Sequence, residues 1–113
     1  MRTKKFKPED PAFARLTVAA VSLEFGTPEL SLDLRRKGTK QIAFSRQVAM
    51  YLLQTVFDMT ISRTAELFSR DRSTVTHALK VIEDSREDEV FNRKLIKVED
   101  FLLTSSSLFG GTA

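Results

Sequence analysis

The chain has 113 residues, of which 42% are apolar, so it is long enough for one folded domain with a modest core. Its formal net charge is +3 and its pI is about 9.4, a basic balance that permits nucleic-acid binding without requiring it. Cysteine is absent and histidine occurs once, which excludes disulfides and leaves too few ligands for most zinc sites.

Residues 1–10 are basic and then broken by prolines and acids, so we expect a flexible arm. The apolar run that follows is too short for a membrane span and has no small-residue cleavage site. We therefore expect a cytoplasmic protein. The first helix should begin with Asp10 as N-cap and Pro11 as its first residue, and end at Gly26. Its buried face is predicted to hold Phe13, Leu16, Ala20 and Leu23.

A short second helix is expected after Thr27 and Pro28, and a basic segment follows it. This segment is either a phosphate-binding patch or a solvated loop, and no acid interrupts its cations, which are Arg35, Arg36, Lys37, Lys40 and Arg46. A strongly apolar helix is then predicted over about 46–57. Because it is apolar nearly all round, it should be central in the domain.

The next two helices are predicted at 61–68 and 72–86, joined by a short turn, which is helix-turn-helix spacing. Thr60 and Asp71 can cap them. The second helix should bury Val75, Leu79 and Ile82 and expose Ser73, His77, Lys80 and Asp84. The DNA major groove admits one helix, and helix N-termini favour phosphate. The pattern therefore favours a DNA-reading helix, although a well-capped solvated helix would show the same pattern.

The acidic stretch 83–89 is interpreted as a solvated helix end that could also keep this part of the helix away from phosphate. A last helix is predicted from Phe91, Leu95, Val98 and Leu102, followed by a flexible tail over 104–113. No strand pattern competes. The predicted fold is all-α, a small helical bundle around a helix-turn-helix, with one domain over 11–103.

From about residue 12 to 103 the chain resembles the C-terminal DNA-binding domain of the DnaA family, the bacterial chromosomal replication initiators. The matching stretches are "SRQVAMYL", "AELF" and "RDRSTVTHALKVIE". They correspond in order and separation to the family's P-R-Q-x-A-M-x-L, F-G-G-R-D-H-T/S-T-V-x-H-A and a following I-E pair. The resemblance implies an all-helical bundle that binds double-stranded DNA at a short A·T-rich element, the DnaA box.

The resemblance also implies residue roles. Asp71 would accept hydrogen bonds from base amino groups, while Ser73 and Thr74 would contact bases or phosphates. His77 would contact a phosphate, and Arg46 would reach the minor groove from the loop before the central helix. The expected DNA-binding set is Arg35, Arg36, Lys37, Lys40, Arg46, Arg70, Asp71, Arg72, Ser73, Thr74, His77 and Lys80.

The chain departs from the family at three places. Arg72 replaces a histidine and would prefer guanine. The stretch "FSRD" is one residue shorter than the family's and lacks glycine, so its turn must be made differently, and Ser45 replaces a proline. A G-x-x-x-x-G-K-[ST] loop is also missing. We therefore expect no nucleotide cofactor and a free-standing box-binding domain.

The functional prediction is sequence-specific binding of double-stranded DNA in the nucleoid, without catalysis or a metal. Ser73 and His77 are four residues apart, but an open helix face offers no oxyanion hole. Two roles fit, namely transcriptional regulation and modulation of replication by competition for initiator boxes, with replication or transcription proteins as possible partners. The alternative is a protein-interaction module derived from a DNA-binding fold.

Overall fold

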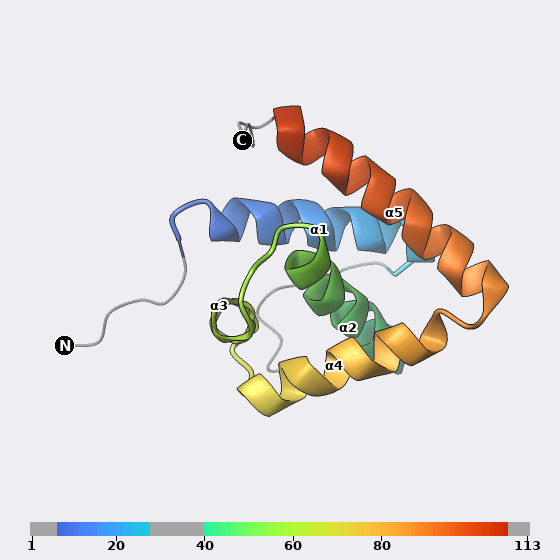
Figure 1. Ribbon diagram of the computed structural model, residues 1–113, viewed down its shortest axis with the longest axis horizontal. Coiled ribbons are helices and arrows are strands. Elements are labelled where there is room, and N and C mark those ends of the chain that lie inside the picture. Colours follow the sequence, from blue (N-terminus) through green and yellow to red (C-terminus); the bar gives the residue numbers. More distant parts are fainter. Residues whose placement is uncertain (1–6, 28–39, 109–113) are drawn as a thin grey trace.

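The computed structural model describes residues 7–27 and 40–108, which form five helices and no strand (Figure 1). The prediction of an all-α bundle is confirmed. The helix expected after Pro28 and the cations Arg35, Arg36 and Lys37 lie outside the described residues. The helices are α1 (Asp10–Phe25), α2 (Lys40–Thr55), α3 (Ile61–Phe68), α4 (Arg72–Ser85) and α5 (Glu89–Leu108).

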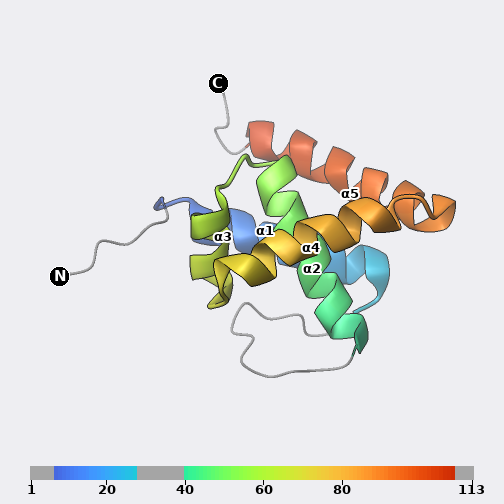
Figure 2. The same ribbon diagram turned by 60° about the horizontal axis from the view of Figure 1, so that its bottom comes forward.

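Helix α2 is the central element, as predicted from its apolar character. It packs against α1 and α4, and Figure 1 shows α1 and α5 on one side of it and α4 on the other. Figure 2 brings α4 forward, where it crosses α2. Six consecutive residues of α2 are buried: Val48, Ala49, Met50, Tyr51, Leu52 and Leu53. The helix begins at Lys40, earlier than predicted, because residues 40–45 include good helix formers and no glycine or proline.

Two predictions for α1 are wrong. Glu9, not Asp10, occupies the N-cap position, and Asp10 lies inside the first turn. Leu23 was predicted to be buried but is 86% exposed, whereas Ala20 is buried and Phe13 and Leu16 pack partly buried against the core, as predicted. The buried apolar residues of α1 are Ala14, Val18, Ala20 and Val21. The C-terminus is as predicted: Gly26 has φ 66° and donates its N–H to the carbonyl of Ser22.

An ion pair joins the start of α1 to α3. Asp10 is fully buried, and its two carboxylate oxygens accept from Nε and Nη2 of Arg63 at 2.8 and 2.7 Å. Burial by itself would raise the pKa of Asp10, but hydrogen bonds from Arg63 and from the Lys7 amide, with the Arg63 charge, hold that pKa below 3.8. This pair fixes α3, the first helix of the predicted helix-turn-helix, to the bundle.

Helix α5 buries Leu95, Val98 and Leu102, as predicted, and packs along α1. It continues to Leu108, and Ser105 is buried. The predicted flexible tail is therefore wrong for residues 104–108, which are helical, and 109–113 lie outside the described residues. Among the described helices, none combines the length and the apolar character that a bilayer crossing needs.

Candidate nucleic-acid interface

Helices α3 and α4 form the predicted helix-turn-helix. Thr60 caps α3 by accepting a hydrogen bond from the Arg63 amide at 3.1 Å, and Ala65 and Phe68 point into the core. Helix α4 buries a narrow stripe of Val75, Ala78 and Ile82, while Leu79 is half-buried. The stripe is narrow enough to leave most of the circumference of α4 open to solvent.

The turn between α3 and α4 has Ser69 at the position where the family has glycine. Ser69 has φ 53° and ψ 46°, the left-handed conformation that glycine adopts without cost. Its amide donates to the carbonyls of Ala65 and Glu66, and the Arg70 amide donates to Ala65 at 3.0 Å. These bonds close the end of α3 and lead the chain directly into α4.

Asp71 occupies the N-cap position of α4, with φ −72° and ψ 155°. Its backbone carbonyl accepts from the Thr74 amide at 3.1 Å, but its side chain makes no capping hydrogen bond. The predicted position is therefore correct and the predicted side-chain cap is wrong. As a result, the carboxylate is exposed at the tip of α4 and is not engaged by the helix itself.

The first turn and outer face of α4 carry the predicted readers, all exposed: Arg72, Ser73, Thr74, His77 and Lys80. Arg72 and Glu66 line the same pocket of about 320 Å³ at the tip, yet no ion pair joins them. Lys80 lies 3.6 Å from Asp84, and both side chains are more than two-thirds exposed. Such an exposed pair is weak and leaves Lys80 available to a stronger anion.

Arg46 does not lie where the resemblance implied. It is inside α2 rather than in a preceding loop, and it is 9% exposed. Burial, and after it the charge of Arg70, lowers the pKa of Arg46. The predicted minor-groove contact of Arg46 stays a prediction, now from a residue that is largely buried within a helix. Lys40 is exposed on the first turn of α2, and Arg70 is half-buried in the turn.

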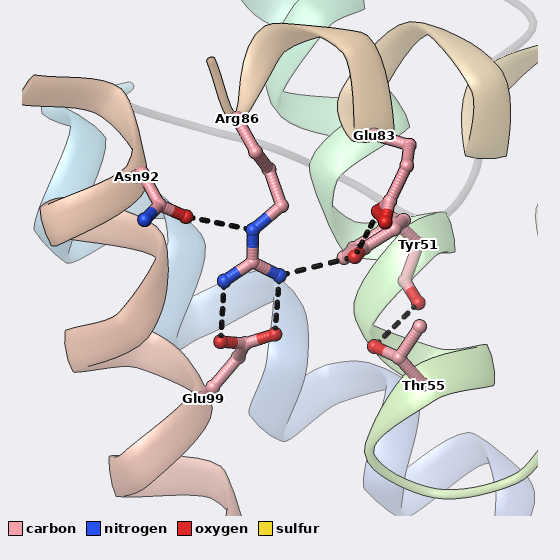
Figure 3. A network of polar contacts seen from close by, with 6 residues as sticks. All are labelled: Tyr51, Thr55, Glu83, Arg86, Asn92 and Glu99. Atoms are coloured by element: carbon pink, nitrogen blue, oxygen red, sulfur yellow. Dashed lines mark hydrogen bonds and ion pairs between the residues drawn. The ribbon is translucent and has the colours of Figure 1, made fainter. Parts of the chain in front are cut away.

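The acidic stretch is only partly the solvated helix end that was predicted. Glu87, Asp88 and Glu89 are exposed, but Glu83 accepts a hydrogen bond from the Tyr51 hydroxyl at 2.8 Å. Arg86, within the same stretch, binds Glu99 of α5 (Figure 3). The sequence pattern could not predict these contacts, because the paired residues are far apart along the chain.

One exposed hydroxyl of α4 was not predicted as a reader. Thr76 lies on the flank of the outer face and, with Tyr51, Leu79 and Lys80, lines a shallow groove of about 420 Å³. Thr76 lies one helical turn before Lys80, and this spacing could have predicted that it shares the exposed face of α4.

A short capped helix, a tight turn and a second helix with an open polar and cationic face define a helix-turn-helix DNA-binding domain. A family model described as the bacterial DnaA protein helix-turn-helix matches residues 16–82, more than half of the chain. The chain therefore belongs to this family. Across residues 7–27 and 40–108, no cluster of three or more metal-ligating side chains occurs.

Two similar relatives are the chromosomal replication initiator proteins DnaA of Thermoanaerobacter sp. (strain X514) and Thermoanaerobacter pseudethanolicus, each 39% identical over 61 residues. The DnaA of Caldanaerobacter subterraneus subsp. tengcongensis matches with the same identity and length. The matched region is 53% of this chain, and the chain spans only 14% of the length of these relatives. No solved structure matches the chain significantly.

Proposed function

We propose that this domain reads a specific duplex sequence related to the DnaA box through the first turn and outer face of α4. The observation that carries the proposal is the Asp71 carboxylate, which is exposed at the tip and makes no cap bond. A free carboxylate accepts hydrogen bonds from the amino groups of cytosine. Arg72 beside it supplies donors suited to guanine.

Among the described residues, the remaining predicted contacts divide into three groups. Ser73 and Thr74 lie on the first turn of α4, within reach of base edges or phosphates once the helix enters the groove. His77, Lys80 and Lys40 are exposed and suited to phosphate. We assign Arg46 and Arg70 a supporting role: their charges interact with one another and add to the positive potential that favours the DNA backbone.

We further propose that the protein acts on DnaA-box-like sites in the nucleoid, where it regulates transcription or competes with an initiator for those sites. The support is that its similar relatives are named as replication initiators and share this helix-turn-helix. A competitor needs only the reading surface, because occupying a box is sufficient to exclude another reader.

The test is selection of bound oligonucleotides from a random duplex pool, followed by titration of the selected site. Asp71→Ala should weaken binding to the selected site by about 1–3 kcal/mol, the value of one base contact, without changing the helical circular dichroism. Asp100→Ala is the matched control, because Asp100 is an exposed acid on α5. A pool that yields no consensus would contradict sequence-specific reading.

A protein-interaction module remains the competing proposal, and one observation favours it. Leu23 and Phe101 are 86% and 51% exposed beside a groove of about 280 Å³ between α1 and α5. Exposed apolar residues of this kind occur at protein interfaces. If Asp71→Ala and Lys40→Ala bind DNA like the parent, while Leu23→Ser abolishes a protein contact, the module proposal would replace the DNA-reading one.

A further inference from the structure

The C-terminal end of α4 is held by a polar network that connects three helices (Figure 3). Arg86 directly follows α4, and its guanidinium donates to both carboxylate oxygens of Glu99 at 2.9 and 3.1 Å. It also donates to Asn92 at 2.7 Å and to the Tyr51 hydroxyl at 3.0 Å. The Tyr51 hydroxyl in turn donates to Glu83 at 2.8 Å.

These bonds tie α4 in two directions. Glu99 and Asn92 lie on α5, whereas Tyr51 lies on the central helix α2 and is only 5% exposed. The Arg86 guanidinium lies 5.9 Å from the centre of the Tyr51 ring, so the contact combines a hydrogen bond with a cation–π interaction. Because a guanidinium is planar and bidentate, its orientation is fixed more tightly than that of a lysine ammonium.

The apolar contacts of α4 lie along one side of the helix. The fully buried residues of α4 are Val75, Ala78 and Ile82, which together form a narrow stripe with a small alanine in the middle. Leu79 and Val81 are partly buried beside this stripe, so apolar packing seats α4 on its neighbours along that side. The polar bonds at Arg86 supply directional contacts that apolar packing does not.

We infer that Arg86 is a positioning residue for sequence reading: by bonding Tyr51, Asn92 and Glu99 it sets the tilt of α4 and hence the place of its tip. This inference rests on the proposed function. A helix of 14 residues spans about 21 Å, so a tilt of roughly 10° about its Arg86 end moves the Arg72 end by about 3.6 Å. The spacing of successive base pairs is about 3.4 Å. A small change of tilt therefore displaces the readers by one base step.

A displaced tip should weaken specific binding much more than non-specific binding. Sequence reading needs Asp71 and Arg72 in register with base edges, whereas non-specific binding depends on cations near phosphates and tolerates displacement. Loss of the network should lower the affinity for the selected site and leave the affinity for unrelated duplex nearly unchanged. If Arg86 served only overall stability, its substitution would leave both affinities of the folded molecules unchanged, for the selected site and for unrelated duplex.

The experiment measures both affinities at one salt concentration for the parent, Arg86→Lys, Arg86→Gln and Glu99→Gln. We expect the ratio of specific to non-specific affinity to fall by roughly ten- to a hundredfold in the Arg86 variants, as for the loss of one or two base contacts. Glu99→Gln should cause a smaller fall. Leu102→Ala is the control for stability, because it removes a buried side chain of α5 that takes no part in the network.

Each result has a distinct meaning once thermal unfolding has been used to correct for the folded fraction. An unchanged ratio in the Arg86 variants, or a fall of equal size in Leu102→Ala, would overturn the positioning role. Absence of any sequence preference in the parent would instead overturn the proposed function itself. Should Arg86→Gln fail to fold, Arg86→Lys and Tyr51→Phe keep the test decisive, because each retains most of the packing and removes part of the network.

Discussion

Arg63 on α3 donates hydrogen bonds to both carboxylate oxygens of Asp10 at the start of α1, although the two residues are 53 positions apart in sequence. Asp10 is completely buried, and the Arg63 side chain is 15% exposed. The pair holds the first helix of the helix-turn-helix against the bundle. Because a buried charge left without its partner is costly, this contact has measurable consequences for stability.

Arg63→Ala should lower the free energy of unfolding by about 3 kcal/mol, because it leaves the Asp10 carboxylate buried without its charged partner. Replacing both partners, in Asp10→Asn with Arg63→Met, should cost much less than the single change. Lys97→Ala serves as the control, because the Lys97–Glu24 pair spans 3.5 Å with Lys97 70% exposed. Urea denaturation measures all four proteins, and equal losses in Arg63→Ala and Lys97→Ala would refute the special role of the buried pair.

The same pair predicts a loss of stability in acid. The folded-state pKa of Asp10 lies below its ordinary value of 3.8, so the unfolded chain binds the proton more readily. The stabilisation is therefore fully present above about pH 5, and it declines as the pH falls through 3.8 toward the lower folded-state pKa. Unfolding free energies measured between pH 6 and 3 should show a smaller slope in Asp10→Asn than in the parent.

Ser69→Gly should stabilise the domain by about 1 kcal/mol, because Ser69 holds a left-handed conformation that penalises any side chain with a Cβ. Asp58, which lies before α3, also has a positive φ, of 55°, so Asp58→Gly should stabilise the domain for the same reason. Thermal unfolding gives the stability of both variants. A destabilised Ser69→Gly would mean that the hydroxyl or the reduced flexibility of serine outweighs the backbone strain.

Arg72→His should shift sequence preference at one position instead of weakening all sites equally. The arginine fork can meet guanine bidentately, whereas histidine reaches less far and offers at most one bond per nitrogen. Arg72 is exposed at the tip and makes no ion pair with Glu66, so it is available for reading. Repeating the oligonucleotide selection with the variant measures the shift. A uniform loss across sequences would mark Arg72 as a phosphate contact.

Affinity for duplex DNA should fall steeply with salt, by about 0.9 log units per log unit of salt for each neutralised phosphate. Lys40→Ala should reduce the slope by about one phosphate, because Lys40 is exposed on the first turn of α2. Lys97→Ala should not, because Lys97 lies on α5 and pairs with Glu24 of α1. If Lys40→Ala and the parent showed equal salt slopes, Lys40 would not contact a phosphate of the DNA backbone.

The sequence alone determines the local elements of this protein and the surface they present. Thr60 and Ser69 to Asp71 delimit α3 and α4, since caps and turns depend on neighbouring backbone groups. The spacing of Val75 and Ile82 likewise determines which face of α4 is buried, and thus which residues can read DNA. These features depend on residues only a few positions apart, so they can be predicted from the sequence.

Only the tertiary structure decides how these elements face one another. It turns α1 so that Leu23 is exposed, buries Arg46 against the bundle, and joins Arg86 to Glu99 and Tyr51. Each outcome depends on which helix lies opposite, and a single helix with apolar side chains on several faces does not specify its neighbour. Long polar side chains add to this, because they reach partners on other helices that no local period can indicate.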